Sequence, residues 1–338
     1  MPVRSLLAAA LLAVTSVLPA SAEGEVNLYS SRHYDTDERL YTDFEAATGI
    51  RVNRIEAKAG ALMQRMRAEG RNSPADVLLT VDAGNLWRAT EAGLLQPVES
   101  EALEARIPEH LRAPDGTWYA FSQRARMIFY AKDRVENPPE TYADLADPRY
   151  EGMVCARSSS NFYMQSLLAS FVAHEGTEAA TDWAKGLYAN LARKPQGGDT
   201  DQLRGLLSGE CDIALANSYY FARALRTDVK GLSGGVERIG WVFPDQGGRG
   251  THVNISGGGV AAHAPNRENA IRFLEYLASG SAQAYFSAGN DEFPVVEGAE
   301  VSPEAASLGE FEADTLNVSE LGTHQREAQR IYDRVGYP

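Results

Sequence analysis

The sequence is poor in cysteine and short of positive charge. Its two cysteines, Cys155 and Cys211, belong to no CxxC pair and to no cluster with metal-ligand spacing. Lysine and arginine number 32 against 46 aspartates and glutamates, which gives a formal net charge of −14. Such an acidic balance disfavours nucleic acids and anionic substrates and favours cationic ligands. We therefore expect no nucleic-acid partner.

Motifs of common enzyme classes are also absent. The chain has no H-E-x-x-H, no G-x-S-x-G and no P-loop. The triple glycine at 257–259 predicts a tight turn. Five histidines lack metal-type spacing with one another, namely His110, His174, His252, His263 and His324. We predict that the protein performs no catalytic turnover.

The N-terminus carries a long apolar run. Arg4 precedes the apolar stretch Leu6–Val17, and the small residues Ala20-Ser21-Ala22 follow it, which is the pattern of a secretory signal. The run is too short for a membrane span and is soon followed by Glu23. We predict a signal peptide over residues 1–22, cleaved near Ala22, and a periplasmic protein. That compartment permits a disulfide between the two cysteines, and two separate buried thiols are an equal alternative.

Short apolar runs alternate with helical patterns in the first part of the mature chain. Strands are predicted at 26–30, 50–57 and 75–82. Between the first two, Leu40, Phe44 and Ala47 recur with helical spacing on one face, and Gly49 ends the pattern. The alternation predicts a β-α-β-α-β unit with a parallel sheet.

A second α/β unit follows a long strand-like stretch at 118–133. We predict strands within 153–157 and 210–220, and separate helices over 161–173 and 178–191. The segment 239–263 is predicted to return to the first unit. Two units joined by two extended crossings describe a protein that closes on a cleft by a hinge.

The predicted domain organisation follows from these crossings. The first lobe comprises residues 23–121 together with about 250–300, and the second lobe comprises 122–249. Residues 301–338 form a C-terminal helical segment.

Polar and phenolic side chains follow three of the predicted strands, where open α/β sheets bind ligands. They are His33 and Tyr34 after the first strand, Tyr163 after the strand at 153–157, and Tyr219 and Tyr220 after the strand within 210–220. A phenolate is a hard oxygen donor that suits Fe³⁺. Because a free phenol has a pKa of about 10, only a strongly polarising cation deprotonates several at neutral pH. A single tyrosine at a helix start more often simply packs there, but the His-Tyr and Tyr-Tyr pairs favour a metal site.

Four phenolates and one Fe³⁺ leave a net charge of −1, which an arginine can neutralise without competing for the metal. Candidates are Arg124, Arg126 and Arg223. Ordinary surface ion pairs are the alternative role for these arginines.

Several segments together resemble the ferric-iron-binding periplasmic proteins of bacterial ABC importers, most of all the FutA-like class. The matching segments are SSRHYDTD, NSPADVLLTVDAG, RSSSNFYMQSL, PQGGD, GECDIALANSYY and GTHVNISGGGV. The resemblance covers nearly the whole mature chain. It implies a two-lobed periplasmic binding protein of the type II fold, with the cleft between two α/β domains.

The resemblance also implies a ligand set and partners. Fe³⁺ would be the transported ligand, held by His33, Tyr34, Tyr163, Tyr219 and Tyr220. An inner-membrane ABC importer permease would receive it, and we expect the protein to be a monomer. Members of the family differ in whether a carbonate-like anion completes the site. Alternatives are a binding protein for another cation or small solute, such as a polyamine or a sugar, and a secreted iron-dependent oxygenase.

Overall fold

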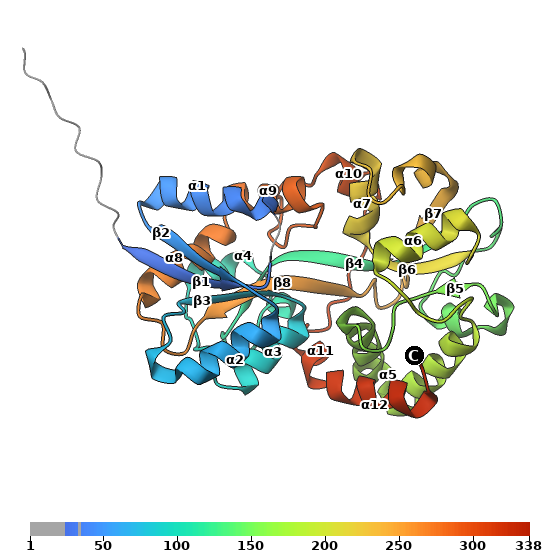
Figure 1. Ribbon diagram of the computed structural model, residues 1–338, viewed down its shortest axis with the longest axis horizontal. Coiled ribbons are helices and arrows are strands. Elements are labelled where there is room, and N and C mark those ends of the chain that lie inside the picture. The colour runs from blue at the N-terminus through green and yellow to red at the C-terminus, as the bar shows by residue number, and fades with distance from the viewer. Residues whose placement is uncertain (1–23, 33–34) are drawn as a thin grey trace, which may run out of the picture.

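The computed structural model describes residues 24–32 and 35–338. Two bodies lie side by side along the long axis, and two extended strands run between them (Figure 1). These strands are β4 (Tyr119–Ala131) and β8 (Val253–Val260), which pair with each other in antiparallel orientation. A path of paired strands passes through both bodies in the order β2-β1-β3-β8-β4-β6-β5, and β7 pairs with β4. The two crossings predicted from the sequence are therefore present.

The first body is built on three parallel strands. They are β1 (Glu25–Ser30), β2 (Arg51–Glu56) and β3 (Val77–Val81). β1 pairs in parallel with both β2 and β3, which confirms the predicted β-α-β-α-β unit, and β3 pairs antiparallel with β8. β1 and β3 are largely buried, whereas β2 is an edge strand of exposed and half-buried residues.

Helices cover both faces of this part of the sheet (Figure 1). They are α1 (Glu38–Thr48), α2 (Ala59–Glu69), α3 (Ala83–Glu91), α4 (Glu101–Arg106), α8 (Arg267–Leu277) and α9 (Gly280–Asn290). α1 ends at Gly49, whose φ of 71° suits a residue without Cβ. The prediction that Ala47 lies on the buried face of α1 was wrong, because Ala47 is exposed and Tyr41 packs beside Phe44 instead.

The triple glycine does not form the predicted tight turn. Gly257, Gly258 and Gly259 lie inside the buried strand β8, between β3 and β4. A Cβ on Gly257 would come 2.5 Å from the carbonyl oxygen of Tyr119, and one on Gly258 would come 2.8 Å from that of Leu78. The glycines therefore permit close approach of neighbouring backbones at the crossing.

The second body continues the sheet with three more strands. They are β5 (Val154–Cys155), β6 (Ile213–Asn217) and β7 (Ile239–Val242). Its main helices are α5 (Phe162–Ala189), α6 (Asp199–Ser208) and α7 (Ser218–Arg226). The two helices predicted over 161–173 and 178–191 are confirmed, because the span α5 is interrupted at Gly176, whose φ of 85° and ψ of 172° are not helical.

Alternate residues of the crossing strand and of β6 serve two different cores. Ile128 and Leu215 pack with the residues of α5 on one face. Phe129 and Ala214 pack on the other face, with residues of α6 and α7. Because both faces are covered, β6 is apolar along most of its length, as expected for a central strand.

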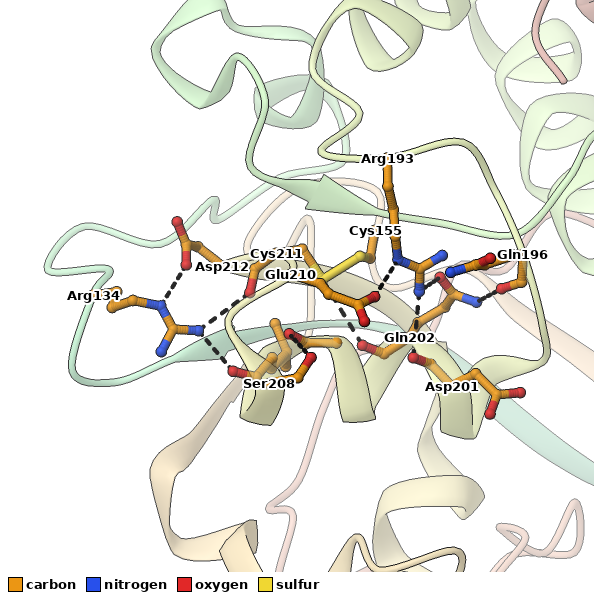
Figure 2. The surroundings of a disulfide bond; sticks show 12 residues. Arg134, Cys155, Arg193, Gln196, Asp201, Gln202, Ser208, Glu210, Cys211 and Asp212 are labelled. Atoms are coloured by element: carbon orange, nitrogen blue, oxygen red, sulfur yellow. Dashed lines mark hydrogen bonds and ion pairs between the residues drawn. A yellow bond between two sulfur atoms is a disulfide. The ribbon is translucent and has the colours of Figure 1, made fainter.

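A disulfide joins Cys155, in β5, to Cys211, just before β6, with 5.8 Å between their Cα atoms (Figure 2). Both cysteines are buried. The sequence left separate thiols as an equal alternative, and the structure places the two sulfurs in one bond.

The C-terminal segment bridges the two bodies. It contains α10 (Pro303–Ala306), α11 (Ser319–Thr323) and α12 (Gln325–Val335). α11 contacts both α3 and α5, and α12 packs along α5. Nearby, the carboxylate of Asp82 accepts hydrogen bonds from Ser166 in α5 and from Asn254 in β8, each at 2.9 Å. In the described part of the chain no helix combines the length and the apolar character that crossing a membrane requires.

Candidate metal centre

Three of the predicted ligand tyrosines lie in the first turns of helices that follow strands along the chain. Tyr163 is the second residue of α5, which starts after β5, and its backbone N–H donates to the side chain of the capping residue Asn161 at 3.1 Å. Tyr219 and Tyr220 are the second and third residues of α7, which follows β6 without a break. Because β5 and β6 are parallel neighbours, both helices start at the same edge of the sheet.

The structure brings two of these phenols together. The hydroxyl oxygens of Tyr163 and Tyr219 are 3.2 Å apart. The rings of Tyr219 and Tyr220 lie against each other, with centroids 4.2 Å apart. Tyr219 is 3% exposed, while Tyr163 and Tyr220 are half-buried. Two oxygens at this separation can both contact one ion, since a metal–oxygen bond is about 2 Å long.

Guanidinium groups surround the same phenols. The Cζ atoms of Arg124, Arg126 and Arg157 lie 5.5, 5.9 and 5.6 Å from the centre of the Tyr163 ring. The Cζ atom of Arg223 lies 5.7 Å from the centre of the Tyr219 ring. Cationic groups at this range stabilise anionic oxygens gathered around a metal. The three arginines proposed from the sequence are thus next to the tyrosines.

Sequence reasoning missed Arg157 and its buried partner Asp199. Arg157 opens the segment RSSSNFY between β5 and α5, and Asp199 ends the segment PQGGD, so both lie in segments that carried the family resemblance. Asp199 Oδ2 lies 2.6 Å from Arg126 Nη1, and its Oδ1 lies 3.6 Å from Arg157 Nη1. Asp199 Oδ2 also accepts the backbone N–H of Asn217 at 2.8 Å. One buried carboxylate therefore balances two of the arginines.

Arg124 is fully buried and faces Tyr163 from the crossing strand β4. Its Nη1 donates to Ser256 Oγ at 3.2 Å. Burial acts to lower the pKa of Arg124, but interaction with Tyr163 and with Glu292 outweighs burial and raises it, so the group stays charged. Its Nε and Nη2, together with the Nε atoms of Arg126 and Arg157, have no hydrogen-bond acceptor among the described residues.

Glu292 connects this region to the start of α1. It lies 3.1 Å from Arg32 Nη1, and its Oε2 accepts from Ser122 Oγ at 2.6 Å. Burial acts to raise the pKa of Glu292, but the charges of Arg32 and Arg124 outweigh it and hold the pKa below its usual range. Arg32 is itself buried and also pairs with Asp37 at 2.9 Å.

His33 and Tyr34, the other two predicted ligands, lie outside the described residues. Arg223, the third predicted arginine, pairs with Asp291 at 3.4 Å and donates to the carbonyl oxygen of Asn290 at 3.1 Å.

The remaining histidines have other surroundings. Burial lowers the pKa of His252 to about 3, and His174 contacts Asp314 at 2.8 Å. Within residues 24–32 and 35–338, no three side chains of His, Cys, Asp or Glu are grouped so as to hold a metal. The donors that the described structure gathers are phenols.

Comparison with known proteins decides the family. The model of the bacterial extracellular solute-binding proteins matches residues 39–313. The chain is also 51% identical to iron uptake protein A1 of a Synechocystis strain, over 93% of this chain and 87% of that protein. This chain belongs to the bacterial extracellular solute-binding proteins.

Two solved structures place the fold of this solute-binding protein. A Trichodesmium FutA (IdiA) structure in complex with iron and citrate is 50% identical, covers 93% of this chain and all of its own, and has a TM-score of 0.91. Apo FutA2 from Synechocystis is also 50% identical, covers 93% of this chain and 99% of its own, and has a TM-score of 0.88. The solute-binding protein has the two-lobed type II fold of this group.

Proposed function

We propose that this solute-binding protein captures ferric iron in the cleft between its two lobes and delivers it to an inner-membrane ABC importer. The observation that carries the proposal is the pair of phenol oxygens of Tyr163 and Tyr219, 3.2 Å apart and next to four guanidinium groups. Phenolates select hard, strongly polarising cations. The relatives named for iron uptake support the same cargo.

The proposed ligands are His33, Tyr34, Tyr163, Tyr219 and Tyr220. Four phenolates on Fe³⁺ carry a net charge of −1, and a neutral imidazole leaves that charge unchanged. The arginines beside Tyr163 and Tyr219 offset the negative charge without donating a lone pair to the metal. The protein acts as a carrier: it binds and releases the ion, and no bond of a substrate is broken.

We propose that the first lobe comprises residues 23–121 and about 250–300, that the second comprises 122–249, and that 301–338 lies across both. The apolar core of the first body runs through Phe121 and resumes at Val253 in β8, which supports these limits. His33 and Tyr34 belong to the first lobe and the other three ligands to the second, so a bound ion would draw the lobes together.

We further propose that residues 1–22 are removed near Ala22, that the mature protein is periplasmic, and that it presents iron to the permease as a monomer. The n-region, apolar stretch and small-residue site support cleavage. Mass spectrometry of the mature protein from the periplasmic fraction tests the cleavage site, and light scattering tests the monomer.

Binding is tested by titrating iron-free protein with ferric nitrilotriacetate. Bound Fe³⁺ should give a red or orange phenolate-to-iron absorption band at one ion per chain. Tyr219→Phe should weaken ferric binding more than about tenfold, because losing even a residue that only orients a metal ligand typically lowers metal affinity at least about tenfold. Tyr188→Phe, in α5 at a residue that is 41% exposed, is the matched control and should bind Fe³⁺ as wild type.

The same titration distinguishes the alternatives. A colourless protein that takes up no Fe³⁺ would contradict the proposal, and saturable binding of a polyamine or a sugar in its place would identify another cargo. Repeating the titration with and without citrate shows whether an anion takes part. The four buried guanidinium nitrogens of Arg124, Arg126 and Arg157 that lack a described acceptor are suited to donate to either phenolates or a small carboxylate.

A further inference from the structure

The disulfide lies at the base of both segments that carry the tyrosines. Cys155 is the last residue of β5, and Tyr163 follows it by eight residues (163 − 155). Cys211 lies just before β6, and Tyr219 follows it by the same number (219 − 211). The S–S bond therefore links the carboxyl end of β5 to the segment that leads into β6, and both strands continue to the paired phenols.

Non-covalent pairing between these strands is sparse. β5 has only two residues, and its parallel register with β6 comprises two pairs, Val154 with Ile213 and Cys155 with Ala214. The backbone N–H of Ile213 donates to the carbonyl oxygen of Met153 at 3.0 Å. A strand this short is well below the usual five or six residues, so the ladder alone holds β5 weakly against β6.

Helix α6 rests directly on the disulfide (Figure 2). A Cβ on Gly205 of α6 would lie 2.8 Å from the sulfur of Cys211 and 3.2 Å from that of Cys155. The first residue of the same helix is Asp199, which binds Arg126 and the backbone of Asn217, two residues before Tyr219. The position of the sulfurs is thus coupled through α6 to the charged groups beside the phenols.

We infer that the Cys155–Cys211 disulfide is a positioning element of the metal centre. It fixes the carboxyl end of β5 relative to the residues that lead into β6, and so holds the hydroxyls of Tyr163 and Tyr219 close together before the metal arrives. Ligands held in place beforehand lose less conformational freedom on binding, which raises affinity. The inference rests on the proposed function, because it assigns the disulfide a role in ferric binding.

The first test is the double variant Cys155→Ala/Cys211→Ala, assayed with ferric nitrilotriacetate far below its unfolding temperature. We expect at least about a tenfold loss of ferric affinity and a shifted absorption band, in the range found when groups that orient metal ligands are removed. Leu187→Ala, a buried residue of α5 away from the site, is the control for lost stability, and it should keep the wild-type band.

A second variant keeps the disulfide and disturbs the packing of α6 against it. Gly205→Ala places a methyl group against both sulfurs, so either the sulfurs or α6 must shift. We expect weaker ferric binding with no free thiol by thiol titration. If the double variant does not fold, the ferric affinity of Gly205→Ala tests the inference. A further test uses wild type that has been reduced anaerobically, desalted and titrated with Ga³⁺, a trivalent ion that thiols do not reduce.

The outcomes separate the two proposals. Wild-type affinity and band in every folded form that lacks or displaces the disulfide would overturn the positioning role. Tyr219→Phe, titrated in parallel, reports on the ligand assignment itself. If oxidised wild type binds no Fe³⁺, or if Tyr219→Phe binds as wild type, it is the proposed function that fails.

Discussion

Replacing Asp199 with asparagine should destabilise the second body strongly, although the side chain is nearly the same size. Asp199 and Arg126 form a pair whose side chains are 0% and 2% exposed, with 2.6 Å between Oδ2 and Nη1. Removing one partner of a buried pair costs about 3–5 kcal/mol, because the other charge stays buried without compensation. Arg126 retains Asn217 Oδ1 as an acceptor at 3.0 Å, so we expect a loss of unfolding free energy at the lower end of that range, about 3 kcal/mol.

The matched control is Asp182→Asn in α5, which makes the same chemical change at an exposed pair. Asp182 and Lys185 are 69% and 61% exposed and 3.1 Å apart. Exposed pairs of this kind contribute at most about 1 kcal/mol. Urea unfolding of the iron-free proteins, followed by tryptophan fluorescence and by circular dichroism, measures both variants. Trp183 lies buried within the second body and reports on it.

A double variant measures the coupling energy between Asp199 and Arg126. Arg126→Met alone should also destabilise the protein, because the buried carboxylate of Asp199 then keeps only the longer ion pair with Arg157, at 3.6 Å, and the backbone N–H of Asn217. Combining it with Asp199→Asn should lower the unfolding free energy by less than the sum of the two single changes, by about 0.5–3 kcal/mol for groups in contact. Two results would refute the view that this carboxylate balances the arginines beside Tyr163. One is a loss of unfolding free energy in Asp199→Asn that lies within about 0.5 kcal/mol of the loss in Asp182→Asn. The other is strict additivity of the losses caused by Asp199→Asn and Arg126→Met.

Three further predictions concern acid and motion. Glu292→Gln should destabilise the protein most near neutral pH. Because the pKa of Glu292 in the folded protein is held below the usual 4.5, its contribution to stability is present above pH 4.5 and is lost as pH falls through the folded pKa. A difference in unfolding free energy between variant and wild type that is the same at all pH values would count against this prediction. Bound iron should be released progressively below a pH of roughly 6, since protons compete for His33 and the phenolates; a visible band that is unchanged down to pH 4 would contradict the ligand set. The radius of gyration from small-angle scattering should shrink when Fe³⁺ binds, with bending in the two crossing strands, and an unchanged radius would remove lobe closure.

Local patterns were enough to predict much of the architecture. β1, β2 and β3 follow from apolar runs and turn residues that lie within a few positions of one another. The helix-ending role of Gly49 follows from its own backbone freedom. The placement of Tyr163 and Tyr219 at strand ends is also local, because in each case a short apolar strand leads into a helix. Only the two crossings needed an argument over longer distances.

Errors arose where a distant neighbour sets the role of a residue. The triple glycine looked like a turn because nothing in its own segment reveals that backbones of β3 and β4 lie against it. Tyr41 packs into the core in place of Ala47 because Phe273 of α8, far along the chain, lies 6.2 Å from its ring. Residue type and spacing carry no information about such partners.

The strand and helix order, the acidic balance and the residue types available for the proposed ferric site can be read from the sequence. Tertiary packing decided that the hydroxyls of Tyr163 and Tyr219, 56 residues apart, come within 3.2 Å, that Arg157 lies over the Tyr163 ring, and that Asp199 pairs with Arg157. It also decided that the two cysteines form one bond. The physical reason is that periodicity reports which face of an element is buried, whereas distances between elements are set by how their side chains pack together.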